Sequence, residues 1–186
     1  VETTITTNVG AVTSLAWTGG TFAAVSGAVQ NTTAPYAEIW VAHNVTGGTQ
    51  TMTVTWGGTG GGRRAFQVTQ LCGGNGTLTT GSGTTGHNTT NPATTGSITG
   101  TPNSGAQAAW IAAVGVARTN ADAAPTWSVP TTAGQKIGAT GGSAMYLAEG
   151  YEIDSSTKTQ SMSATLATAA AWGSAMAVFL EPAGSG

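Results

Sequence analysis

Two stretches of the chain are apolar at nearly every position, residues 107–118 and residues 172–182. Read with the two-residue period of a strand, each presents apolar side chains on both of its faces. A strand of this kind is covered on two sides and lies in the middle of a sheet. The alanines of the first stretch would also suit a helix, but its β-branched residues, Gly115 and the lack of a polar stripe favour a strand. The pattern therefore predicts that these two strands are neighbours at the centre of the fold.

The other apolar positions alternate with polar ones over short stretches. The clearest alternation covers residues 50–56, where Met52, Val54 and Trp56 share one face and threonines share the other. Glycine, proline and asparagine separate such stretches, as expected of turns. Further strands are expected at residues 11–17, 22–25, 36–44, 65–71, 143–153 and 159–166. The whole pattern predicts an all-β fold, an antiparallel, jelly-roll-like β-sandwich of about eight to ten strands in which no helix is required.

The domain organisation follows from the same pattern. Residues 11–182 are predicted to form a single β-sandwich domain, with residues 183–186 as a short tail. Residues 1–10 are more polar, and they are expected to form an edge strand or an N-terminal arm that pairs with a neighbouring molecule. The face of this arm that would make the assembly contact carries Val1, Thr3, Ile5 and Thr7.

Residues 73–105 form a long stretch of glycine, threonine, serine and asparagine, in which Leu78 and Ile98 are the large apolar residues. A connection of this length is unusual within a compact domain. We expect either a surface excursion or an exposed β-ribbon that is ordered by contact with something else. A second long connection, residues 120–142, contains two prolines and Trp127 and is expected to be an ordered loop.

Charged residues are scarce, since five basic and seven acidic side chains give a net charge of -2 over 186 residues. Polarity comes instead from 36 threonines, which together with 29 glycines suit strands and turns. So few Lys and Arg residues leave no electrostatic footprint for nucleic acid and no polybasic patch for a membrane surface. Cys72 is the only cysteine, which excludes an intrachain disulfide. We expect no cofactor, no nucleic-acid partner and no membrane partner.

Glu149, Glu152 and Asp154 are the candidates for a calcium site or for a pair of catalytic carboxylates. On a strand Glu152 and Asp154 share one face and Glu149 takes the other, so the three converge only if a bulge intervenes. A calcium ion would also need backbone carbonyl groups from a nearby loop. The two histidines, His43 and His87, lie in unrelated stretches and add neither a metal site nor a base for a serine nucleophile. We therefore interpret the acidic residues as a solvated strand end and assign no catalytic residue.

Three further side chains are candidates for a contact with a partner or a glycan. Arg63 and Arg64 are adjacent in a chain with few basic residues, so they are candidates for an anion or carboxylate contact, although the favoured interpretation is that they cap and solubilise the start of a strand. Trp127 lies in a proline-bounded loop and is the tryptophan that suits stacking on a sugar ring. The tryptophans of the predicted strands lie in apolar register and are expected in the core.

Four segments resemble a known group of proteins. They are residues 12–21 (VTSLAWTGGT), 37–42 (AEIWVA), 50–56 (QTMTVTW) and 171–182 (AWGSAMAVFLEP). In this order they resemble the glycine- and threonine-rich β-sandwich domains found in phage structural proteins and in bacterial surface or secreted proteins. Such domains usually open with another apolar strand before the segment that matches Val12, whereas the polar residues 1–10 precede it here. The resemblance implies the fold and a structural or binding role, and it carries no catalytic residue across.

The function expected from these observations is that of a non-enzymatic virion structural protein, a decoration or accessory protein that coats or stabilises a phage capsid. Its partners at the virion surface would be the major capsid protein or another virion protein, and further copies of itself. One alternative is a carbohydrate-binding or adhesive module of a secreted bacterial protein, extracellular or at the cell surface, with a glycan at Trp127. Another is the subunit of a self-assembling surface filament, in which the N-terminal arm completes the sheet of the next subunit.

Overall fold

The computed structural model describes residues 2–7, by their main chain, and residues 11–32, 34–43, 45–57, 63–71, 79–118, 121–138 and 145–183. Within these ranges every helix or strand element is a β-strand, and the paired strands are antiparallel. The predicted all-β, sandwich-like fold is confirmed. There are seventeen strands in this part of the chain, six of them only two or three residues long. The count exceeds the prediction because such short ladders carry no hydrophobic period.

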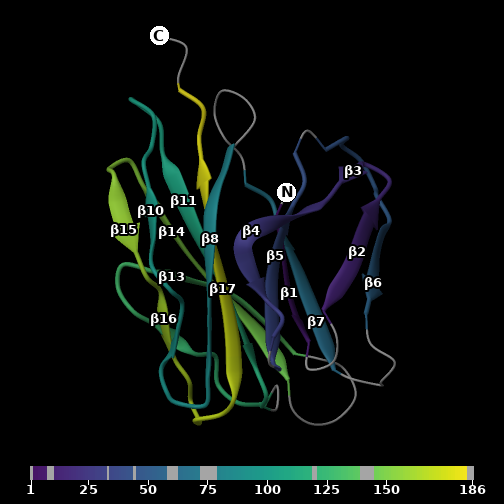
Figure 1. Cartoon of the computed structure of the whole chain (residues 1–186), viewed down its shortest axis with the longest axis vertical. Coiled ribbons are helices and arrows are strands. Elements are labelled where there is room, and N and C mark those ends of the chain that lie inside the picture. Colours follow the sequence, from purple (N-terminus) through teal and green to yellow (C-terminus); the bar gives the residue numbers. More distant parts are fainter. Residues whose placement is uncertain are drawn as a thin grey trace.

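A five-stranded sheet forms the centre of the molecule (Figure 1). β11 and β17 are neighbours in it and pair along their whole lengths, from Ala108↔Leu180 to Val116↔Trp172. In each of the two strands eight of nine residues are buried. The predicted central pair is therefore confirmed. The spatial order of the sheet is β13 (Thr132–Gly138), β14 (Tyr146–Asp154), β11 (Ala108–Val116), β17 (Trp172–Leu180) and β8 (Thr79–Asn88).

A four-stranded sheet packs on one face of the central sheet. Its order is β4 (Ala23–Gln30), β5 (Tyr36–Val41), β1 (Glu2–Thr7) and β7 (Arg64–Thr69). Between the two sheets lies an apolar layer. It consists of Val25, Ala28, Ala37, Ile39, Val41, Ile111, Ala175, Ala177 and Phe179.

β1 corrects the prediction of an edge strand or a free arm. It lies between β5 and β7 and pairs with both, and Thr3, Ile5 and Thr7 all belong to this doubly paired strand. Val1 and residues 8–10 lie outside the described residues. The polar composition was misleading because a strand in this position is held by hydrogen bonds to two neighbours, which polar residues make as well as apolar ones.

One side of the sandwich is closed by β4 and β8, which approach each other through glycines. A Cβ atom added at Gly83 would lie 2.5 Å from the main-chain nitrogen of Ala28. Gly27, at φ +80, would place its Cβ 2.4 Å from the carbonyl oxygen of Gly83. Only glycine permits a main-chain approach of this kind.

β8 also corrects the expectation, for residues 73–105, of a surface excursion or of an exposed β-ribbon ordered by contact with something else. It is a ten-residue strand that pairs with β17, and β9 (Ala93–Thr94) and β10 (Ile98–Gly100) follow it. Residues 73–78 lie outside the described residues. The glycines that resemble a loop in the sequence are the residues that allow this strand to pack closely. The second expected loop likewise contains β12 (Thr126–Trp127) and β13.

The remaining short strands cover the other face of the central sheet. β12, β16 (Ser163–Thr165) and β9 form one ladder, and β10 pairs with β15 (Lys158–Gln160). Large side chains fill the space between these strands and the central sheet. They include Trp110, Trp127, Tyr146, Met162, Trp172 and Met176.

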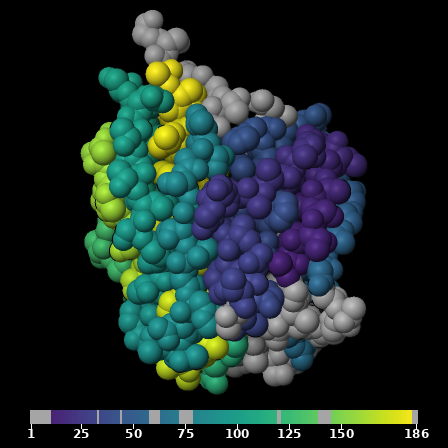
Figure 2. All heavy atoms as spheres, viewed as in Figure 1, coloured from purple at the N-terminus to yellow at the C-terminus, as the bar shows by residue number. Residues whose placement is uncertain are grey.

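An outer sheet of β3 (Gly20–Thr21), β2 (Val12–Trp17) and β6 (Met52–Trp56) completes the layers, beside the four-stranded sheet in Figure 1. Glu38 of β5 ties the two together, because its carboxylate accepts hydrogen bonds from the Val12 nitrogen at 3.1 Å and from Trp40 Nε1 at 3.0 Å. Burial raises the pKa of Glu38, and these two bonds oppose the rise. Figure 2 shows the first third of the chain, purple to blue, on one side of the molecule and later residues on the other.

Candidate functional site

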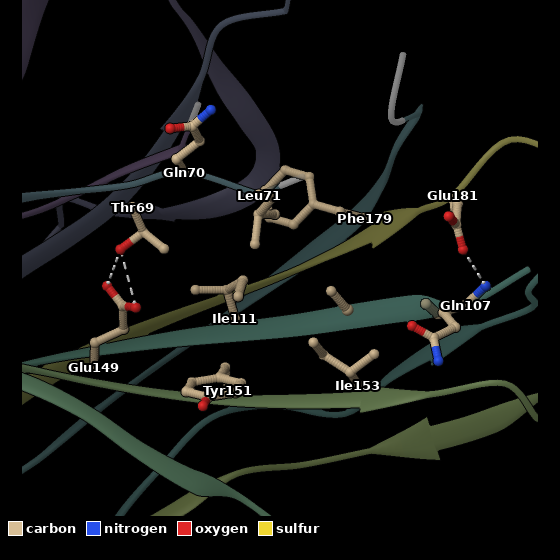
Figure 3. A pocket seen from close by; sticks show the side chains of 12 residues that line it. Thr69, Gln70, Leu71, Gln107, Ile111, Glu149, Tyr151, Ile153, Phe179 and Glu181 are labelled. Atoms are coloured by element: carbon tan, nitrogen blue, oxygen red, sulfur yellow. Dashed lines mark hydrogen bonds between the residues drawn. The ribbon is translucent and has the colours of Figure 1, made fainter. Parts of the chain in front are cut away.

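A groove of about 300 Å³ opens where the four-stranded sheet ends over the central sheet (Figure 3). Thr69, the last residue of β7, hydrogen-bonds to Glu149, whereas β14 continues for five more residues to Asp154. The central sheet therefore extends beyond the sheet that covers it. We call this cavity the end groove. Its apolar lining residues are Leu71, Ala108, Ala109, Ile111, Tyr151, Ile153 and Phe179, and its polar ones are Thr69, Gln70, Gln107, Glu149 and Glu181.

Strand register explains why the apolar residues share one surface. Ile111 of β11 is opposite Tyr151 of β14, and Ala109 is opposite both Ile153 and Phe179. Because side chains alternate along a strand, these odd-numbered positions all project from the same face of the central sheet. Ile153 is the most exposed of them, at 52%. An exposed isoleucine on this face marks the open side of the end groove.

Glu149 closes one end of the end groove as a buried carboxylate, only 3% exposed. Its Oε2 accepts a hydrogen bond from Gln67 Nε2 at 2.8 Å. The Thr69 hydroxyl lies 3.1 and 3.0 Å from the two carboxylate oxygens. These donors come from β7, so the carboxylate joins the two sheets at the point where the groove begins. Such bonds offset the cost of burying a charged group.

Glu181 marks the opposite end, just beyond β17 (Figure 3). Its Oε2 accepts a hydrogen bond from the Gln107 main-chain nitrogen at 3.0 Å, and its own nitrogen donates to the Gln107 carbonyl oxygen at 2.9 Å. Asn103 Nδ2 donates to the Glu181 carbonyl oxygen at 3.1 Å. The position of Glu181 is thus fixed by main-chain and side-chain contacts before any ligand binds.

The two carboxylates are too far apart to act as a catalytic pair. Glu149 is opposite Ala113 of β11, and Glu181 bonds to Gln107, which immediately precedes β11 and is six residues from Ala113 in the sequence. At the rise of a β-strand this places them about 20 Å apart, whereas paired carboxylates in glycosidases are separated by less than about 10 Å. The end groove can hold an elongated ligand, but its acidic groups do not converge on one bond of it.

The acidic residues predicted as a metal or carboxylate site divide between two faces, as the strand pattern predicted. Glu152 and Asp154 both form ion pairs with Lys158, away from the groove. The hydrogen bond to Glu152 raises the pKa of Lys158, and a main-chain hydrogen bond from Ser156 lowers that of Asp154. The interpretation as a solvated strand end is wrong for Glu149 and Glu152, because both are buried.

Metal-ligating residues do not gather within the described part of the chain, where no group of three His, Cys, Asp or Glu residues could hold an ion. His43 Nε2 lies 3.1 Å from the Thr80 hydroxyl, and His87 Nε2 lies 3.3 Å from the Ala34 carbonyl oxygen. His43 thus contacts β8, whereas His87, itself in β8, contacts the connection between β4 and β5. In the same described residues no helix is long and apolar enough to cross a membrane.

The three candidates for partner contacts do not come together. Trp127 is only 8% exposed and packs against Gly150, where an added Cβ would lie 2.7 Å from the indole ring. The prediction of an exposed sugar-stacking tryptophan is therefore wrong, since a two-residue strand places the ring in the core. Arg64 lies over the Trp56 ring, 5.0 Å from its centroid. Arg63 is half-buried and contacts other groups of the chain. Their predicted anion contact stays a prediction.

Sequence reasoning missed the end groove, although it named Glu149. Tyr151, Ile153 and Phe179 lie in strands that the pattern predicts, and Gln107 and Glu181 lie at the ends of such strands. The signal that would have identified them is the difference in length between strands of two sheets, which requires knowing which strands face each other.

No family model, no curated protein and no solved structure matches this chain.

Proposed function

We propose that this chain is a non-enzymatic structural protein of a phage particle, a decoration or accessory protein that lies on the capsid surface together with further copies of itself. The observation that carries the proposal is that the charged side chains contact other groups of the same chain. Eleven of the twelve charged side chains are described, and each of them contacts another group of the same chain. These groups serve the fold, and they form no convergent catalytic arrangement.

A surface with so few charged side chains favours association chiefly through shape and buried area. Charge-assisted recognition needs charged groups directed at the partner. Threonine, serine, glycine and alanine instead give a neutral surface that can pack closely on a protein lattice. The five sheets, held together by buried clusters, also provide a rigid body for a permanent covering layer.

β7 offers a concrete contact surface for such a role. It is an edge strand of the four-stranded sheet, and Phe66 and Val68 on it are each 45% exposed. Exposed large apolar side chains on an edge strand favour association with another protein. The two earlier alternatives lose the residues on which they depended. Trp127 is buried and so does not support glycan binding, and residues 2–7 are paired on both sides and so do not support a strand-donating filament arm.

The proposal is tested with purified phage particles of the source. Mass spectrometry should find this chain in stoichiometric amounts, and the purified protein should bind to particles from which it has been removed. Replacing both Phe66 and Val68 by Ser should lower the number of copies bound. Val129→Ser is the matched control, because Val129 is 94% exposed and lies on a different strand connection. Particles that lack the chain, and that do not bind it when it is added, would contradict the proposal.

A further inference from the structure

We propose that the end groove binds an extended peptide segment about six residues long, with apolar side chains at alternate positions and one Lys or Arg residue. Ile153 in its lining is 52% exposed, and Leu71, Ala109 and Tyr151 are partly exposed. The peptide would lie along β11, between Glu149 at one end and Glu181 at the other.

The dimensions of the end groove suit an extended chain. Its two acidic ends are about 20 Å apart, the length of six residues in a strand. Its width spans three neighbouring strands, β14, β11 and β17. A cavity of about 300 Å³ is at the lower limit for a compact small-molecule site, and here that volume is spread along a strand.

The floor of the end groove selects apolar side chains. Leu71, Ala109 and Tyr151 are its partly exposed base, above the buried Ile111 and Phe179. Ile153 lies at the open side (Figure 3). A peptide in the β-conformation presents every second side chain to this floor and the others to water. Gln70 and Gln107 are exposed at the rim, where their amide groups can bond to a peptide main chain.

The charge of the end groove selects a basic residue. Among the described residues, the lining contains two glutamates and no Lys, Arg or His side chain. Glu149 is buried beneath β7, whereas Glu181 is half-exposed at the opposite end. The Lys or Arg side chain would therefore lie near Glu181, where it keeps contact with water while it approaches the carboxylate.

A library of random heptapeptides tests this assignment, with the purified protein as the probe. The wild type should enrich peptides with alternating apolar residues and a Lys or Arg. Ile153→Lys places a positive charge on the open side of the end groove. It should lower the affinity for these peptides by about tenfold or more. Val129→Lys is the matched control, because it makes the same kind of change at a site outside the groove, and it should leave binding unchanged. Equal melting temperatures of the variants would show that each is folded.

Glu181→Gln supplies a second, milder variant, since glutamine keeps an oxygen for the Gln107 nitrogen but removes the charge. This variant should no longer prefer peptides that contain Lys or Arg, and added salt should no longer weaken its binding. A peptide with Ala in place of the Lys should bind the wild type and the variant equally. The assignment is overturned if the wild type enriches no more peptides than Ile153→Lys does. It is also overturned if the enriched peptides are acidic or if Glu181→Gln leaves the salt dependence intact.

That such a segment belongs to a capsid protein rests on the proposed function. The coating of particles is measured separately with the same variants. This measurement distinguishes a failure of the proposed function from a failure of the groove assignment. Absence of coating despite selective peptide binding overturns the proposed function alone, and absence of selective peptide binding overturns the groove assignment alone.

Discussion

Gly83→Ala tests whether β8 is an integral strand that closes the sandwich. The added Cβ would lie 2.5 Å from the Ala28 nitrogen, 2.6 Å from the Ala28 Cβ and 2.8 Å from the Ser26 carbonyl oxygen. Two of these three atoms belong to the main chain of β4, so no side-chain rotation relieves the overlap. β4 is held by β5, and β8 is held by β17. Either strand must move away from a partner to make room.

The expected loss of stability follows from these overlaps. Forcing an extra methyl group into a closely packed site costs about 1–3 kcal/mol. Alanine also restricts the unfolded chain more than glycine does, and this effect by itself raises the free energy of unfolding by about 0.4–1 kcal/mol. Because the overlap involves main-chain atoms we expect a net loss of about 2 kcal/mol, equivalent to a fall of about 4–8 °C in the melting temperature of a chain of this length.

Urea denaturation followed by tryptophan fluorescence measures this loss, with calorimetry for the melting temperature. Gly47→Ala is the matched control, because no atom lies within 4 Å of its added Cβ. It should leave the free energy of unfolding unchanged or raise it by up to about 1 kcal/mol, because only the restriction of the unfolded chain remains. The reasoning is refuted if Gly83→Ala is as stable as the wild type, or if the control loses as much.

Three further substitutions test the buried polar groups and the core. Burial raises the pKa of Glu38, so the native state binds the proton more tightly than the unfolded chain. The free energy of unfolding should therefore fall as the pH rises above about 4.3, the ordinary glutamate value, and Glu38→Gln should show a smaller fall in urea titrations across that range. An equal fall would contradict this origin. Trp127→Ala should cost about 3–5 kcal/mol in the same assay, and a cost below about 1 kcal/mol would show that the ring is not part of the core. Thr69→Val removes a hydroxyl bonded to the buried Glu149 and should cost about 1–3 kcal/mol; Thr99→Val, at an exposed hydroxyl pair, should cost less, and equal costs would contradict the role of Thr69.

The sequence alone determined the features that depend on the period of side chains along a strand. Two stretches apolar on both faces predicted the central pair β11 and β17, because only a strand covered on two sides requires apolar residues at consecutive positions. The same two-residue period placed Glu149 on the opposite face from Glu152 and Asp154. The scarcity of charge and the abundance of threonine and glycine pointed to strands and turns throughout.

Only the tertiary structure decided the features that depend on which strands meet. The polar β1 is an inner strand because hydrogen bonds to β5 and β7 hold it, and these bonds leave no mark on side-chain pattern. The glycines of β8 resemble a loop in the sequence, and only the close packing of β4 against them shows why a strand has glycine there. The end groove exists because β7 ends at Thr69 while β14 and β17 continue, and a difference in extent between two facing sheets has no counterpart along the sequence of either one.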